Sequence, residues 1–224
     1  WTVEDTVQLL KTGQNRFATV SGNMADVIHH STQHFTDADL TAIASYLKSL
    51  PPGKDDLPMP AVAVEPVKAP DTLFTSRGGL GYTQFCADCH RPDGGGVKGM
   101  FPPLNGNPGI TAANPATLLH ITLTGWKTPQ TAAHPRVYTM PGFARLADSE
   151  VAEILSFVRS SWGNDAPAIS PAQVAKMRKQ LNPLTTDETA FVTPRLANLL
   201  SAANAGQVVR GMRLHLQTKA LLPD

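Results

Sequence analysis

Cys86-Ala87-Asp88-Cys89-His90 forms a Cys-x-x-Cys-His motif that holds the only two cysteines of the 224-residue chain. Two thiols at this spacing can add across the two vinyl groups of a haem, and the imidazole that follows can bind the iron from below. The motif therefore predicts one covalently attached haem c. Cys86 and Cys89 would carry the thioether bonds, and His90 would be the proximal iron ligand.

Three other chemistries fit the motif less well than haem attachment. A structural zinc site needs four ligands, and the motif supplies three, of which the adjacent Cys89 and His90 are badly placed for a tetrahedron. A thioredoxin-like dithiol needs a βαβ context, which this helix-and-loop sequence lacks. A plain disulfide between Cys86 and Cys89 is possible, but it would leave the methionine loop described next without a role.

A methionine sulfur opposite a histidine is the usual axial arrangement in cytochromes c. Met140 is the favoured sixth ligand because it lies 50 residues after His90, in a loop stiffened by a following proline and glycine. Met100 is only ten residues from His90, too near to reach the opposite face without strain. Met177 and Met212 fall on apolar helix faces and are expected to fill the core.

The surroundings of the haem offer further candidates. A ligating histidine usually donates its other ring N–H to a carbonyl or carboxylate. Pro102 or Pro103, in the stiff loop after a glycine run, is expected to supply that carbonyl. Tyr82, Trp126 and Arg136 are candidates to reach the haem propionates.

Two stretches of the chain, 111 residues apart, show the same order of features. Each has an acidic helix start, at 36–39 and at 147–150, followed by a one-sided apolar helix, and each is preceded by a glycine-terminated helix and a loop methionine, Met24 or Met140. The matching helix positions are Asp37/Asp148, Ile43/Ile154, Ser45/Ser156, Tyr46/Phe157 and Lys48/Arg159. The first copy has no Cys-x-x-Cys-His. Its beginning is expected to be missing, and Met24 would bind iron only if an upstream haem is present.

Composition and spacing together predict a mostly α fold. Residues 1–52 are read as the C-terminal half of a cytochrome c domain and 53–70 as a proline-rich linker. Residues 71–165 are read as a complete class-I-like cytochrome c domain, and 166–224 as a helical extension that could contact a partner or a membrane surface. The net charge of +1 gives no reason to expect nucleic-acid binding. No apolar run reaches the roughly 20 residues that cross a bilayer.

Four stretches resemble one family, the multi-haem (triheme) cytochrome c subunits of periplasmic, membrane-associated dehydrogenases for alcohols, aldehydes and gluconate. They are Tyr82 to Gly96, Phe101 to Pro108, Tyr138 to Phe143 and Asp148 to Asn164. Residues 22–52 resemble the end of that family's second haem domain. The resemblance implies further haems upstream, a catalytic dehydrogenase subunit as partner, and electron transfer to a membrane quinone or another acceptor. It also implies a periplasmic location, peripheral to the inner membrane.

Two other functions stay open at this point. A haem with an exchangeable sixth site would make the protein a haem enzyme or a ligand sensor. Alternatively, residues 163–224 would have a non-redox role in docking the complex. The favoured interpretation is an electron-carrier subunit and not the catalytic subunit.

Overall fold

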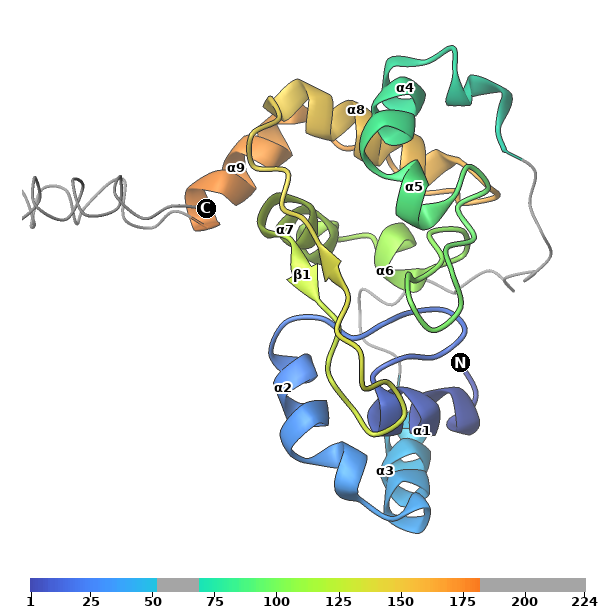
Figure 1. The fold of residues 1–224 in the computed structure, drawn as a ribbon. Coiled ribbons are helices and arrows are strands. Elements are labelled where there is room, and N and C mark those ends of the chain that lie inside the picture. Colours follow the sequence, from blue (N-terminus) through green and yellow to red (C-terminus); the bar gives the residue numbers. More distant parts are fainter. Residues whose placement is uncertain (52–68, 182–224) are drawn as a thin grey trace, which may run out of the picture. The chain divides into compact units, whose positions relative to one another are not determined.

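The computed structural model describes residues 1–51 and 69–181. Trp1–Met177 forms one compact unit, and Arg178 begins a second, of which only the end of one helix is described. The described chain is mostly helical (Figure 1). Its elements are α1 (Val3–Thr12), α2 (Asn23–His30), η1 (Thr32–His34), α3 (Asp37–Ser49), η2 (Asp71–Leu73), α4 (Arg77–Phe85), α5 (Ala87–His90), α6 (Pro108–Thr111), α7 (Ala116–Thr124), β1 (Trp126–Lys127), β2 (Thr139–Met140), α8 (Asp148–Ser160) and α9 (Pro171–Leu181).

Helices α4 and α8 pack against each other closely because α4 contains glycines. A Cβ atom on Gly78 would lie 2.3 Å from the carbonyl oxygen of Glu153, and one on Gly81 would lie 2.6 Å from Ile154 Cγ1. Larger residues at these positions would push the helices apart. The apolar face of α8, including Val151 and Leu155, is buried. This close packing fixes the helix that leads into the Cys-x-x-Cys-His motif.

An aromatic cluster closes the end of this helix pair. Tyr82 is fully buried, with its ring centroid 5.5 Å from that of Phe157 and 5.0 Å from that of Trp162. Trp162 donates from Nε1 to the carbonyl of Pro92 at 2.9 Å. A Cβ on Gly94 would lie 2.6 Å from the Trp162 ring, so the glycine loop after the motif can lie flat on it. The cluster therefore anchors the motif's outgoing loop to α8.

The two copies of the internal repeat share backbone geometry. Helices α3 and α8 each contain 13 residues, and both begin after a residue near φ −70° and ψ +156°, Thr36 and Ala147. Helices α1 and α7 both end at a glycine in the positive-φ region, Gly13 at +80° and Gly125 at +76°. Glycine adopts these angles without steric cost. The local repeat is thus present in the fold as well as in the sequence.

Met24 was expected in a loop, and this expectation is wrong. It lies in the first turn of α2 and is 43% exposed. The preceding Gly22 adopts φ +60°, which lets the chain turn directly into a helix at Asn23. Ile28, completely buried, anchors α2 to the rest of the N-terminal segment, residues 1–51.

Helix α9 lies within the predicted helical extension, residues 166–224. The Gln173 amide donates to Ser170 Oγ at 3.3 Å, and Pro171 is its first residue. Val174 and Met177 are buried, in agreement with a core role for Met177. The expectations for residues 53–68 of the linker and for the tail from residue 182, including Met212, lie outside the described residues. Among the residues described, no helix has the length and apolar character needed to cross a membrane.

Candidate functional site

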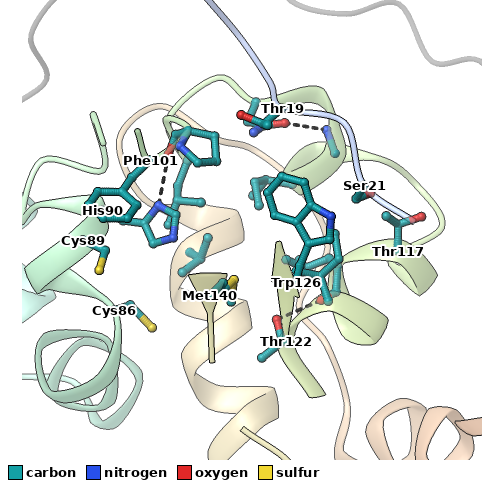
Figure 2. Close-up of a pocket in the computed structure, with 18 of the residues that line it drawn as sticks. Thr19, Ser21, Cys86, Cys89, His90, Phe101, Thr117, Thr122, Trp126 and Met140 are labelled. Atoms are coloured by element: carbon teal, nitrogen blue, oxygen red, sulfur yellow. Dashed lines mark hydrogen bonds between the residues drawn. The ribbon is translucent and has the colours of Figure 1, made fainter. Parts of the chain in front are cut away.

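The three chemical groups of the motif are presented by the junction of α4 and α5. Helix α4 ends at Cys86, and α5 runs from Ala87 to His90 as a single turn. The amides of Cys89 and His90 both donate to the carbonyl of Cys86, at 3.2 and 2.9 Å. Residues three positions apart on a helix share a face. The two sulfurs therefore lie on one side, with the imidazole next to them (Figure 2).

His90 is buried, and its orientation is fixed by a hydrogen bond. Its Nδ1 donates to the carbonyl oxygen of Pro102 at 3.0 Å. That carbonyl comes close because Gly96 has no side chain: a Cβ there would lie 2.3 Å from the oxygen of Phe101 and 2.6 Å from that of Pro102. Burial lowers the pKa of His90, opposed by the bond to Pro102. The imidazole is therefore held neutral, with Nε2 as the ring nitrogen left to bind a metal.

A cavity of about 330 Å³ opens in front of these groups. Its volume is in the range of small-molecule and cofactor sites. Cys86, Cys89 and His90 line it on one side, while Met140 and Trp126 lie across from them (Figure 2). Most of the wall is apolar, with α6, α7 and α8 contributing Ile110, Leu118, Ile121, Ile154, Leu155 and Val158. The cavity suits a flat, largely apolar group that carries a metal.

The Met140 backbone is held from two directions. It pairs with Trp126 in the short antiparallel ladder between β1 and β2. On the other side, a Cβ on Gly125 would lie 2.6 Å from the Met140 carbonyl oxygen, and one on Gly142 would lie 2.8 Å from the Leu123 carbonyl. The two glycines thus let the methionine segment lie directly against the end of α7. This contact places the Met140 side chain on the cavity wall.

The Cys86 thiol has the low reactivity of a buried, protonated cysteine. Both cysteines are free. Burial, together with the nearby Cys89, raises the pKa of the Cys86 thiol to about 12, so it stays protonated at neutral pH. A reactive dithiol would need a lowered pKa. In the described ranges, no three His, Cys, Asp or Glu side chains gather as a metal site would require. The donor set of two thiols, one neutral imidazole and one thioether fits haem c.

Of the other predicted residues, Pro102 and Trp126 lie where the sequence places them, and Pro103 and Tyr82 do not. Pro102 binds His90, whereas the carbonyl of Pro103 accepts from Asn107 Nδ2 at 2.9 Å. Trp126 lines the cavity, as expected for a haem contact. Tyr82 does not line it, because packing against α8 turns its hydroxyl to the carbonyl of Arg91 at 2.6 Å. Burial raises the pKa of Tyr82 far above its usual value.

Two further candidates, Arg136 and Met100, differ in whether they line the cavity. Arg136 is exposed and outside the cavity lining. Met100, judged too close to His90 in sequence, is half-buried and does line the cavity. The structure therefore brings two methionines to the wall, Met140 and Met100. Met24 is not a lining residue.

Sequence reasoning missed several wall residues. Helix α7 is apolar on nearly all sides, with Leu118, Leu119 and Leu123 buried, and such a pattern marks a helix covered on all faces. That signal was available. Thr19 and Ser21 of the N-terminal segment also line the cavity. No sequence pattern marked these, because they reach the wall through contacts between residues about 100 positions apart.

Comparison with known proteins agrees with this geometry. The cytochrome c family profile matches residues 76–162. Cytochrome c-552 of Thermus thermophilus is 32% identical over 108 residues, which is 46% of this chain and 74% of that protein. This chain belongs to the cytochrome c family. The family implies haem c, and the residues that line the cavity provide the groups that haem c requires.

Longer relatives match more of the chain. The cytochrome c subunit of alcohol dehydrogenase (quinone) from Gluconobacter oxydans (strain 621H) is 38% identical over 201 residues, 83% of this chain. The gluconate 2-dehydrogenase cytochrome c subunit of Pantoea cypripedii is 38% identical over 186 residues, 80% of this chain. The chain spans 40% and 42% of the length of these two relatives. It is therefore related to cytochrome c subunits of dehydrogenases.

Proposed function

We propose that residues 71–165 form a cytochrome c domain that holds one haem c and carries single electrons. Cys86 and Cys89 would tether the haem through thioether bonds, and His90 and Met140 would ligate the iron. The observation that carries this proposal is the convergence of two thiols, a neutral imidazole and a thioether on one apolar cavity. When bound, the haem supplies reversible one-electron chemistry at its iron, with no bond made or broken in a substrate.

The residues around the cavity have clear tasks in such a carrier. The Pro102 carbonyl fixes the tautomer of His90 and makes it a more basic ligand. The apolar wall would exclude water, and a thioether among the iron ligands would favour the reduced iron, so both would raise the reduction potential. The close approach that Gly125 and Gly142 allow between the methionine segment and the end of α7 would hold the sulfur in position. A rigid site of this kind supports electron transfer over ligand exchange.

The relatives suggest a partner. We propose that the protein receives electrons from a catalytic dehydrogenase subunit and passes them toward a membrane quinone or another acceptor. It would work in the periplasm, peripheral to the inner membrane, because haem c is attached outside the cytoplasm. Two relatives are named as subunits of an alcohol dehydrogenase (quinone) and a gluconate 2-dehydrogenase. Ethanol and gluconate are therefore the first electron donors to test.

We also propose that residues 1–52 are the C-terminal half of a second cytochrome c domain. On α8, Phe157 and Val158 are buried in the domain that carries the motif. The equivalent residues on α3, Tyr46 and Leu47, are 65% and 48% exposed. Apolar side chains that are buried in one copy and exposed in the other favour a missing helix of the α4 type. Further haems, with Met24 as a candidate ligand, would belong to such an upstream segment.

Spectroscopy and redox titration of the holoprotein test the proposal. An electron carrier would show a c-type absorption spectrum, titrate as a one-electron couple and stay six-coordinate in both states. Membranes that contain the protein would show haem reduction on addition of ethanol or gluconate. A five-coordinate haem that turns over peroxide would favour a haem enzyme. A six-coordinate haem that none of these donors reduces would contradict the proposed partner while leaving the carrier role intact.

A further inference from the structure

The long loop between β1 and β2, residues 128–138, leads directly into Met140. It reaches from the cavity to helices α1 and α2 of the N-terminal segment (Figure 1). Its near end is stiffened locally: the Thr128 amide donates to the Tyr138 carbonyl at 2.9 Å, and the Tyr138 amide donates to Thr128 Oγ1 at 2.8 Å. A displacement of the loop would therefore be passed to β2 and to Met140.

The far end of the loop is bound by three hydrogen bonds to residues about 100 positions earlier. Thr131 Oγ1 donates to the Thr12 carbonyl at 3.2 Å, at the end of α1. His29 Nδ1 donates to the Gln130 carbonyl at 2.6 Å, and the Ala132 amide donates to Gln33 Oε1 at 3.1 Å. Each of the three bonds uses a backbone group on one side. They therefore fix the path of the loop as well as individual side chains.

Shape reinforces these bonds. Gly13 and Pro129 are both buried, and a Cβ on Gly13 would lie 2.4 Å from Pro129 Cγ. Gly13 also adopts φ +80°, where a side chain is strained. Thr131 is only 4% exposed, so its bond to Thr12 is shielded from water. The proline ring thus fits a notch that only glycine at the end of α1 leaves open.

We propose that the N-terminal segment acts as a clamp on this loop and so positions the Met140 sulfur for the iron. The clamp consists of Thr12, Gly13, His29 and Gln33 and holds residues 129–132 of the loop. This inference rests on the proposed ligation by Met140. It gives residues 1–51 a task in the haem site of the following domain, whatever that segment binds itself. Anything that shifts α1 or α2 would then change the strength of the iron–sulfur bond.

The test compares three variants of the full-length holoprotein with the parent. The double variant Thr131→Val/Gln33→Leu removes one donor and one acceptor of the clamp without adding bulk. Thr131→Ser is the conservative match, because its hydroxyl can still donate to the Thr12 carbonyl and accept from the His134 amide. Thr75→Val is the surface control, since its hydroxyl bonds within its own turn, to the Asp71 carbonyl. Should the double variant fold poorly, the single variant Thr131→Val gives the same comparison.

Three readouts are taken together. Hydrogen exchange at the Ala132 amide reports the clamp itself and needs no haem signal. Carbon monoxide binding to the reduced haem, which displaces the methionine, and the midpoint potential report the iron–sulfur bond. For the double variant we expect faster exchange, a lower potential and at least about fivefold tighter apparent binding of carbon monoxide, the equilibrium effect of losing one average hydrogen bond. Thr131→Ser and Thr75→Val should resemble the parent.

The outcomes separate two failures. A parent protein without methionine ligation would overturn the proposed ligand and the clamp's role together. A parent with methionine ligation whose potential and carbon monoxide binding do not change, although Ala132 exchanges faster, would overturn the clamp proposal alone. Unchanged exchange at Ala132 in the double variant would show that the bonds do not hold the loop, and would overturn it as well.

Discussion

The Nδ1 atom of His90 lies 3.0 Å from the carbonyl oxygen of Pro102. This contact depends on Gly96, whose own amide donates to the His90 carbonyl at 3.0 Å. Gly96 adopts φ +63°, and its missing side chain leaves room for the Phe101 and Pro102 carbonyls. The orientation of His90 thus depends on Gly96, six residues later, because this glycine lets the Pro102 carbonyl reach the imidazole.

Gly96→Ala should therefore change the iron ligand without removing it. The new Cβ would meet two backbone oxygens, which cannot move aside as a flexible side chain can. We expect a free energy of unfolding lower by about 1–3 kcal/mol and a higher midpoint potential, because a histidine that loses its hydrogen bond donates less charge to the iron. Gly163→Ala is the matched control. Its φ is +82° but no atom lies within 4 Å of the added Cβ, so it should show the strain without the shift in potential.

Met140→Ala should open the sixth coordination site. We expect the midpoint potential to fall and carbon monoxide to bind the reduced haem readily, because the thioether that favours reduced iron is gone. Met100→Ala is the matched control, since Met100 also lines the cavity and has the same side chain. The absorption spectrum and potential of Met100→Ala should match those of the parent. The reverse pattern would assign the sulfur ligand to Met100.

Arg159 is a buried cation whose role is structural. It is 1% exposed, and its guanidinium donates to the carbonyls of Ile110, Ala112 and Pro167 at 2.6, 3.0 and 2.8 Å. Burial lowers its pKa. Arg159→Met would leave the buried Ile110 carbonyl and two part-buried carbonyls, those of Ala112 and Pro167, without this donor. We therefore expect a loss of about 3 kcal/mol in the free energy of unfolding. Denaturant titration measures it, with the exposed Arg136→Met as the control. A loss as small as that of the control would show that water replaces the guanidinium.

Asp5 should make the N-terminal segment sensitive to acid. Burial alone would raise the pKa of Asp5, but hydrogen bonds from the Thr2 amide and Arg16, with the Arg16 charge, outweigh it and hold the pKa below its usual value. A depressed folded-state pKa contributes stability that is present above the unfolded value near pH 4 and is lost as the pH falls through the folded value.

Denaturant titrations of Asp5→Asn across pH test this effect. At pH 7 the variant should lose about 2 kcal/mol, the contribution of hydrogen bonds to a charged group, and its stability should depend less on pH below 4. Asp37→Asn is the control, because Asp37 is an exposed carboxylate whose side chain is 85% exposed. An equal loss in both variants would contradict a special role for Asp5.

Much of the site could be predicted from local patterns. The Cys-x-x-Cys-His motif and Pro102 as the partner of His90 both follow from residue types whose chemistry leaves few choices. Met140, predicted to lie opposite His90, does line the cavity across from it, because a stiff loop before a helix has limited reach. Local patterns did not reveal contacts between residues that are far apart in the sequence. Tyr82 turned to the Arg91 carbonyl because of its packing against Phe157 and Trp162, which its place in the sequence does not reveal.

Helix starts show the same limit. Gly22-Asn23 looks like a turn, yet Gly22 at φ +60° starts α2 and carries Met24 into a helix. The choice between a loop and a helix there depends on the burial of Ile28, a tertiary contact. The clamp between Gly13 and Pro129 is likewise invisible in sequence, because neither residue carries a pattern that points to the other.

The intact mass of the purified holoprotein under denaturing conditions shows whether haem is bound covalently to Cys86 and Cys89. We expect the mass of the polypeptide plus one haem, because two thioether bonds survive unfolding. The Cys86→Ala/Cys89→Ala variant should keep only the polypeptide mass. A parent protein that shows the bare polypeptide mass after haem loading would contradict covalent attachment at these cysteines, and with it the site described above.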